Sequence, residues 1–128
     1  SISQDFVEDN KGAYDVTNYV PYNKTLYTEN FKLIDCPQNI GNISLITKMK
    51  DTSMQPLIKN GALLFVQYVS SLGENDICLV LYNDEVLVRE FSTSKNNIKL
   101  VPKNPSFETI TISKNDENFT IVGKILYY

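Results

Sequence analysis

The sequence contains no histidine, and only two of its 128 residues are cysteine. The lack of histidine excludes Ser-His-Asp and Cys-His nucleophiles, His-liganded zinc and histidine-based pH switching. Cys36 and Cys78 are too few for a secreted disulfide scaffold, so they predict a reducing, cytoplasmic location. Any catalysis by this chain therefore needs a base other than histidine.

Long apolar runs and an excess of positive charge are also absent. No window approaches the roughly 20 apolar residues of a membrane span, which predicts a soluble protein without a membrane partner. The formal net charge is -3, and the lysines and arginines are scattered. Nothing here forms the positive surface of a nucleic-acid groove, so DNA contact would require a domain outside this sequence. We identify no metal site and no cofactor motif.

Composition divides the chain into three parts. Residues 1–13 are polar and begin with Ser rather than Met, so we expect the remnant of a linker to an upstream segment. Residues 14–30 are rich in Tyr, Val, Asn and Thr and contain Pro21, which favours an extended arm over a helix. Residues 31–128 are predicted to form one compact domain.

Short β-type runs fill the chain after Asn42, and no run keeps a helical period for three turns. Asn83-Asp84 and Asn96-Asn97 lie between runs and tolerate positive φ, so both predict hairpin turns. The last run is apolar on both faces, which indicates a central strand or one covered by a partner subunit. We expect an all-β, largely antiparallel domain. The predicted strands are 43–49, 63–69, 77–82, 85–91, 98–102, 109–113 and 119–128.

A Ser-Met pair, Ser53-Met54, follows one apolar run, and Gly61 precedes the next. This segment resembles the signature of the LexA, UmuD and phage-repressor autoprotease family. Further landmarks of that family appear in order as Glu-Val-Leu-Val-Arg at 85–89, Leu-Val-Pro-Lys-Asn at 100–104 and a final strand containing Gly123. The resemblance covers roughly residues 43–128. It implies strongly bent antiparallel sheets of the LexA C-terminal domain type, with a β-clip or SH3-like core.

The resemblance also implies a serine that attacks the protein's own N-terminal arm, with a lysine amine as general base. Ser53 matches the nucleophilic serine, but Arg89 stands at the position of the lysine. Bringing an arginine with a solution pKa near 13.8 to neutrality at pH 7 would cost about 9 kcal/mol. Asp51 replaces the usual glycine, and residues 20–29 contain neither Ala-Gly nor Cys-Gly, the family's scissile dipeptides. The resemblance therefore implies an incomplete catalytic site.

Alternation along the predicted strand places Leu87, Arg89 and Phe91 on one face. We expect a half-buried Arg89 guanidinium that binds Asp51, Ser53 or a carbonyl oxygen, in a structural role. Three lysines could restore a base from a new direction, although surface lysines are more often solvated. They are Lys48, Lys50 and Lys103.

These observations favour a dimerisation and regulatory domain of a phage-type or prophage-type transcriptional repressor that no longer cleaves itself. The alternative is an active, self-cleaving serine peptidase of the LexA or UmuD type. A translesion-polymerase accessory protein is a third option. A membrane signal peptidase is disfavoured because those enzymes carry a membrane anchor and because the Leu-Val-Pro-Lys-Asn landmark points to repressors. The expected partners are a second copy of the chain, as homodimer or higher oligomer, and a small antirepressor protein or a recombinase filament.

Overall fold

The computed structural model describes residues 42–128 in full, together with the backbone of three short strands that precede them. These are β1 (Val20–Tyr22), β2 (Thr25–Tyr27) and β3 (Leu33–Asp35), which form a three-stranded antiparallel sheet. β1 and β2 fall within the predicted arm and are extended. The predicted linker, residues 1–13, lies outside the described residues.

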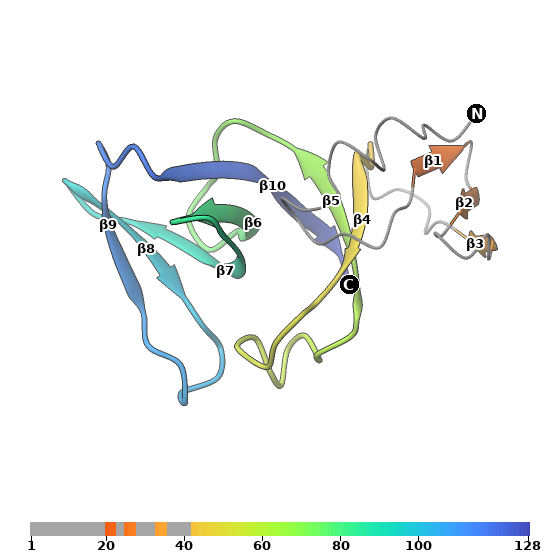
Figure 1. Ribbon diagram of the computed structural model, residues 1–128, viewed down its shortest axis with the longest axis horizontal. Coiled ribbons are helices and arrows are strands. Elements are labelled where there is room, and N and C mark those ends of the chain that lie inside the picture. The colour runs from red at the N-terminus through yellow and green to blue at the C-terminus, as the bar shows by residue number, and fades with distance from the viewer. Residues whose placement is uncertain (1–19, 23–24, 28–32, 36–41) are drawn as a thin grey trace.

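A seven-stranded antiparallel sheet forms the rest of the molecule, in the order β4-β5-β10-β6-β7-β8-β9 (Figure 1). The part of the chain that the structure describes contains no helix, so the all-β prediction is confirmed. Each predicted strand is present, with ends shifted by no more than a few residues. The strands are β4 (Leu45–Lys48), β5 (Leu63–Tyr68), β6 (Ile77–Tyr82), β7 (Glu85–Thr93), β8 (Asn97–Val101), β9 (Ile110–Ser113) and β10 (Phe119–Tyr127).

One of the two predicted hairpin turns is confirmed, and the other is displaced. Asn83 and Asp84 have φ values of 50° and 67° and join β6 to β7, as their tolerance of positive φ predicts. The second turn lies before Asn97, because Asn97 is already the first residue of β8 and pairs with Ser113. Ser94 closes that turn by donating its N–H to the carbonyl of Asn97 at 2.9 Å.

β10 is an interior strand at which the sheet bends, as one of the two interpretations of the apolar last run predicts, and cover by a partner subunit stays a prediction. Its first part pairs with β6 and its second part with β5, and the register shifts between Ile121 and Gly123 and again between Ile125 and Tyr127. In Figure 1, β10 accordingly runs from the β6–β9 side of the molecule to the β4–β5 side. The strongly bent antiparallel sheet predicted by the family resemblance is confirmed.

Buried side chains gather in two clusters, one on each side of the strongly bent sheet. Consecutive residues of one strand point to opposite faces and so belong to different clusters, as Leu79 and Val80 of β6 do. The first cluster contains Leu45, Met49, Met54, Ile58, Leu64, Val66, Leu79, Val88, Val122 and Ile125. The second contains Cys78, Val80, Leu87, Phe91, Leu100 and Ile112.

We expect Gly123→Ala to destabilise the fold by about 1–3 kcal/mol, the usual cost of overpacking. A Cβ at Gly123 would lie 2.6 Å from Cγ1 of Val66 and would also collide with the carbonyl oxygen of Gln67, which belongs to the backbone and cannot swing away. Denaturant unfolding of both proteins measures the difference.

Gly73→Ala is the matched control, because a Cβ there would meet Asp76 at an ordinary 3.5 Å. We expect a change within about 0.5 kcal/mol for that variant. Equal stabilities of Gly123→Ala and the unchanged protein would contradict the close approach of β10 to β5.

Candidate active site around Ser53

The chain between β4 and β5 forms the turn that carries Ser53, at the bottom of Figure 1. Two backbone hydrogen bonds close its base, from Met49 N–H to the Ala62 carbonyl at 2.8 Å and from Gly61 N–H to the Met49 carbonyl at 2.7 Å. Met54 is fully buried in the first core cluster, together with Met49. The Ser-Met pair thus combines an apolar anchor with a hydroxyl whose position the anchor fixes.

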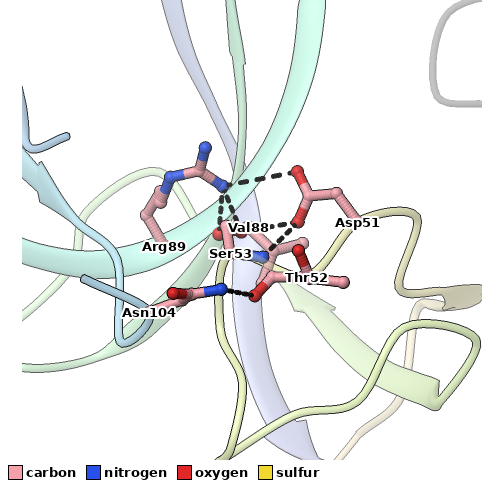
Figure 2. Close-up of polar contacts among 6 residues, drawn as sticks. All are labelled: Asp51, Thr52, Ser53, Val88, Arg89 and Asn104. Carbon is pink, nitrogen blue, oxygen red and sulfur yellow. Dashed lines mark hydrogen bonds and ion pairs between the residues drawn. The ribbon is translucent and has the colours of Figure 1, made fainter. Parts of the chain in front are cut away.

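The segment after β8 holds this turn from a second side. The N–H groups of Lys103 and Asn104 both donate to the carbonyl of Ser53, at 3.0 and 2.9 Å. The side chain of Asn104 donates from Nδ2 to the carbonyl of Thr52 at 3.0 Å (Figure 2). The Leu-Val-Pro-Lys-Asn landmark therefore positions the serine turn, a role that its sequence alone did not reveal.

Arg89 comes from β7 and points at Ser53 (Figure 2). Its Nη1 donates to Ser53 Oγ at 2.7 Å and to the carbonyl of Val88 at 2.8 Å, and lies 3.9 Å from Asp51 Oδ2. The three acceptors predicted for the guanidinium, which are Asp51, Ser53 and a carbonyl oxygen, all lie around Arg89 Nη1. The prediction of a half-buried guanidinium was wrong, however, because Arg89 is only 4% exposed. Residues 87, 88 and 89 are all buried, since the bent sheet covers both faces of β7 here.

Asp51 is the second charged residue that binds the serine. Its Oδ1 accepts the backbone N–H of Ser53 at 2.9 Å and the hydroxyl of Ser53 at 2.6 Å. Since a guanidinium can only donate, Ser53 Oγ accepts from Arg89 and its own hydrogen points to Asp51. A distance of 2.6 Å is that of a charge-assisted O–H···O⁻ hydrogen bond.

The electrostatics around Arg89 combine burial with partial compensation. Burial lowers the pKa of Arg89, and the negative charge of Asp51 opposes this effect. The ring of Phe107 lies 5.6 Å from the guanidinium carbon, within the range of a cation–π contact. Arg89 Nε is buried and has no hydrogen-bond partner among the described residues. Even so, the pKa of an arginine starts far above that of any other side chain, so this group remains a cation.

The lysines that were considered as substitute bases do not take that role. Lys103 contributes its backbone N–H to the site, but its amine binds Glu90 Oε1 at 3.2 Å. Lys48 and Lys50 are exposed. No lysine amine is among the hydrogen-bond partners of Ser53 in the described part of the chain.

A group of residues that sequence reasoning missed completes the site. Asn104, Phe107 and the carbonyl of Val88 were not predicted to take part. Asn104 was visible only as the last residue of a family landmark. A backbone carbonyl and an aromatic ring leave no specific signal in the sequence.

The hydroxyl of Ser53 is held by two hydrogen bonds, one accepted from Arg89 and one donated to Asp51. Ser53 has no exposed surface. The group at the position of the base is a permanent cation, and the acceptor of the hydroxyl proton is a carboxylate, a much weaker base than an amine. Residues 42–128 hold no cluster of three or more His, Cys, Asp or Glu side chains that could bind a metal ion. They also include no helix that is long and apolar enough to cross a membrane.

A model of the Peptidase S24-like family matches residues 8–126 of the chain. The chain belongs to this family. Several LexA repressors are similar to it. The one from Saccharophagus degradans is 36% identical over 81 residues, 61% of this chain and 40% of that protein. The one from Providencia rettgeri is 30% identical over 79 residues, 61% of this chain and 38% of that protein.

The LexA repressor of Geobacter metallireducens is 26% identical over 98 residues, 77% of this chain and 49% of that protein. The chain thus spans less than half the length of the relatives it matches. The resemblance inferred from the Ser-Met pair and the later landmarks is confirmed. This S24-like chain is a LexA-like domain, related to repressors, with the serine peptidase fold of its family.

Replacement of Asn104 by Ala should loosen the serine turn of this S24-like domain. It removes the hydrogen bond to the Thr52 carbonyl and the 2.9 Å bond that Asn104 Oδ1 accepts from Ser106 N–H. We expect a loss of about 1–2 kcal/mol in the free energy of unfolding. Amide hydrogen exchange should also accelerate in the turn.

Asn118→Ala is the control, since Asn118 is exposed and its side chain makes no hydrogen bond within residues 42–128. Its stability should stay within about 0.5 kcal/mol of the unchanged protein. A similar small effect of Asn104→Ala would show that the backbone hydrogen bonds alone hold the turn.

Proposed function

We propose that this chain is the dimerisation and regulatory C-terminal domain of a transcriptional repressor that does not cleave itself. One observation carries the proposal. Arg89 Nη1 donates to Ser53 Oγ at 2.7 Å, at the position where the family resemblance places the base lysine. A base must accept the proton of the serine, and a guanidinium has no lone pair available to accept it.

The geometry supports descent from a self-cleaving protein with later loss of the reaction. Ser53 and Arg89 are 36 positions apart in sequence and meet in space, as a nucleophile and its base must. Asp51 and the buried state of Ser53 both oppose attack by the hydroxyl. We therefore assign Ser53 to the nucleophile position and Arg89 to the position of the base, without activity at either.

If the domain no longer cleaves itself, its remaining role in a repressor is to hold two copies of the protein together. A repressor that binds a two-fold operator needs its DNA-binding domains held as a pair, and a C-terminal domain can supply that pairing. DNA contact then belongs to a separate N-terminal domain, with residues 1–13 as the linker and 14–30 as the former cleavage arm. Release from DNA requires another trigger, for which a small antirepressor protein is our hypothesis.

The C-terminal end of β10 is the surface that we assign to pairing. Tyr127 and Tyr128 are 45% and 47% exposed, although the rest of β10 lies in the middle of the sheet. Tyr127 packs edge-on against Phe65, with ring centroids 5.5 Å apart, so its orientation is fixed before a partner arrives. Exposed tyrosines of fixed orientation are common in protein interfaces.

The full-length protein should stay intact when incubated at alkaline pH, with or without an activated recombinase filament. The physical reason is that the acceptor of the Ser53 hydroxyl is the weakly basic Asp51 carboxylate, while the group at the position of the base is a permanent cation. Gel electrophoresis over time measures the intact fraction, with a self-cleaving LexA repressor as the positive control in the same mixture. Cleavage that Ser53→Ala abolishes would establish the alternative, an active peptidase, and refute our proposal.

The domain should sediment as a dimer at high micromolar concentration, and Tyr128→Asp should shift it towards monomer by placing a charge in an apolar contact. Leu57→Asp is the matched control, because Leu57 is similarly exposed, at 40%, but lies in the serine turn. Analytical ultracentrifugation measures both. A purely monomeric domain would overturn the pairing role, and an equal effect of the two variants would overturn its assignment to β10.

A further inference from the structure

The hydroxyl of Ser53 lies between two charged groups of opposite sign (Figure 2). Asp51 Oδ1 is 2.6 Å away and Arg89 Nη1 is 2.7 Å away. Arginine at position 89 accounts for the hydrogen bond that Ser53 Oγ accepts, but not for the one that its hydroxyl donates. The carboxylate independently takes up the one hydrogen that the serine can donate.

The same carboxylate acts on whatever cation stands at position 89. Asp51 Oδ2 lies 3.9 Å from Arg89 Nη1. An opposite charge within about 4–6 Å stabilises the charged form of a basic group and raises its pKa. A lysine amine in this place would therefore be held as ammonium, which cannot accept a proton from Ser53. Loss of the arginine alone would not recreate a base.

We propose that Asp51 is a positioning residue that keeps Ser53 unreactive, both by accepting its hydroxyl hydrogen and by holding any cation at position 89 in its charged form. This inference rests on the proposed function, because it concerns the same site. It predicts that residues 51 and 89 must both change before the serine can be activated.

A purely structural role of Asp51 is the competing explanation. The bond from Ser53 N–H to Asp51 Oδ1, at 2.9 Å, is a local turn contact that an asparagine can also make. Asp51→Asn therefore separates the two roles, because it keeps an oxygen acceptor and removes the charge. Asp51→Gly is a second neutral replacement in case the first fails to fold.

The experiment compares Arg89→Lys alone with Arg89→Lys combined with Asp51→Asn. The pKa of the introduced amine is measured by NMR titration of its neighbouring labelled carbon. We expect a pKa lower by about one unit or more in the double variant, which is at least tenfold more neutral amine at a given pH. Arg89→Lys with Asp84→Asn is the matched control, because it removes the same charge from the exposed β6–β7 turn.

Other ionisable groups near position 89 stay the same in all these variants. Glu85 raises the pKa of Arg89, as Cys78 does once its thiol is ionised, and neither residue is changed. Burial raises the pKa of the Cys78 thiol to about 12, so Cys78 is uncharged at neutral pH. A difference between the Asp51 and Asp84 combinations thus reports the carboxylate at position 51.

Labelling of Ser53 by a fluorophosphonate gives a second readout, with Ser53→Ala as the blank. We expect at least tenfold faster labelling at neutral pH in Arg89→Lys with Asp51→Gly than in Arg89→Lys alone, because glycine removes both the acceptor of the hydroxyl hydrogen and the charge. Equal amine pKa values in the single and double variants would overturn the inference. So would a folded Arg89→Lys, Asp51→Gly variant whose serine stays unlabelled at every pH, or failure of both neutral replacements to fold.

These outcomes are distinct from failure of the proposed function. Ser53-dependent cleavage of the unchanged full-length protein refutes the proposed function, whatever the amine pKa values are. Equal pKa values refute only the role of Asp51 and leave the inactive repressor domain in place.

Discussion

The burial of one permanent positive charge constrains the arrangement of the whole site. Arg89 is 4% exposed, and a charge taken out of water is tolerated only with acceptors and counter-charge around it. Three segments supply these contacts. The serine turn provides Ser53 Oγ and Asp51, β7 provides the Val88 carbonyl, and the segment after β8 provides the ring of Phe107. Loosening any of them would leave the guanidinium less compensated.

The bend of the sheet is what allows these segments to meet. In the sheet order, β4 and β7 are four positions apart, which in a flat sheet would separate them by about 19 Å at the usual strand spacing. Ser53, just after β4, is nevertheless 2.7 Å from Arg89 on β7. β10 pairs with β6 and then with β5 across its register shifts, and Gly123 lets the backbones approach closely where the sheet turns. The geometry of the site thus depends on a strand that contributes no side chain to it.

The sequence predicted the features that depend on neighbouring residues, such as strands and turns, and those marked by a segment typical of the family. Alternating apolar residues located the strands, and the conformational tolerance of Asn83-Asp84 located a turn. It could not give the depth of Arg89, because burial depends on which segments cover a strand after the sheet has bent. It also misplaced the turn at Asn97, since the pairing of Asn97 with Ser113 extends β8. The role of Asn104 was hidden because its acceptor is a backbone carbonyl, which is common to every residue.

Arginine at position 89 can make the same contacts as a lysine, but it cannot act as a base. Either side chain can donate to Ser53 and sit beside a carboxylate, but only an amine can lose its proton within the range that a protein site supplies. An apolar residue would have left Ser53 Oγ and the Asp51 carboxylate without their cationic partner. The bond from Asp51 to the Ser53 N–H also holds the turn locally. The contacts that join Asp51, Ser53 and Arg89 thus stabilise the turn and, under the proposed function, also withhold a base from the serine.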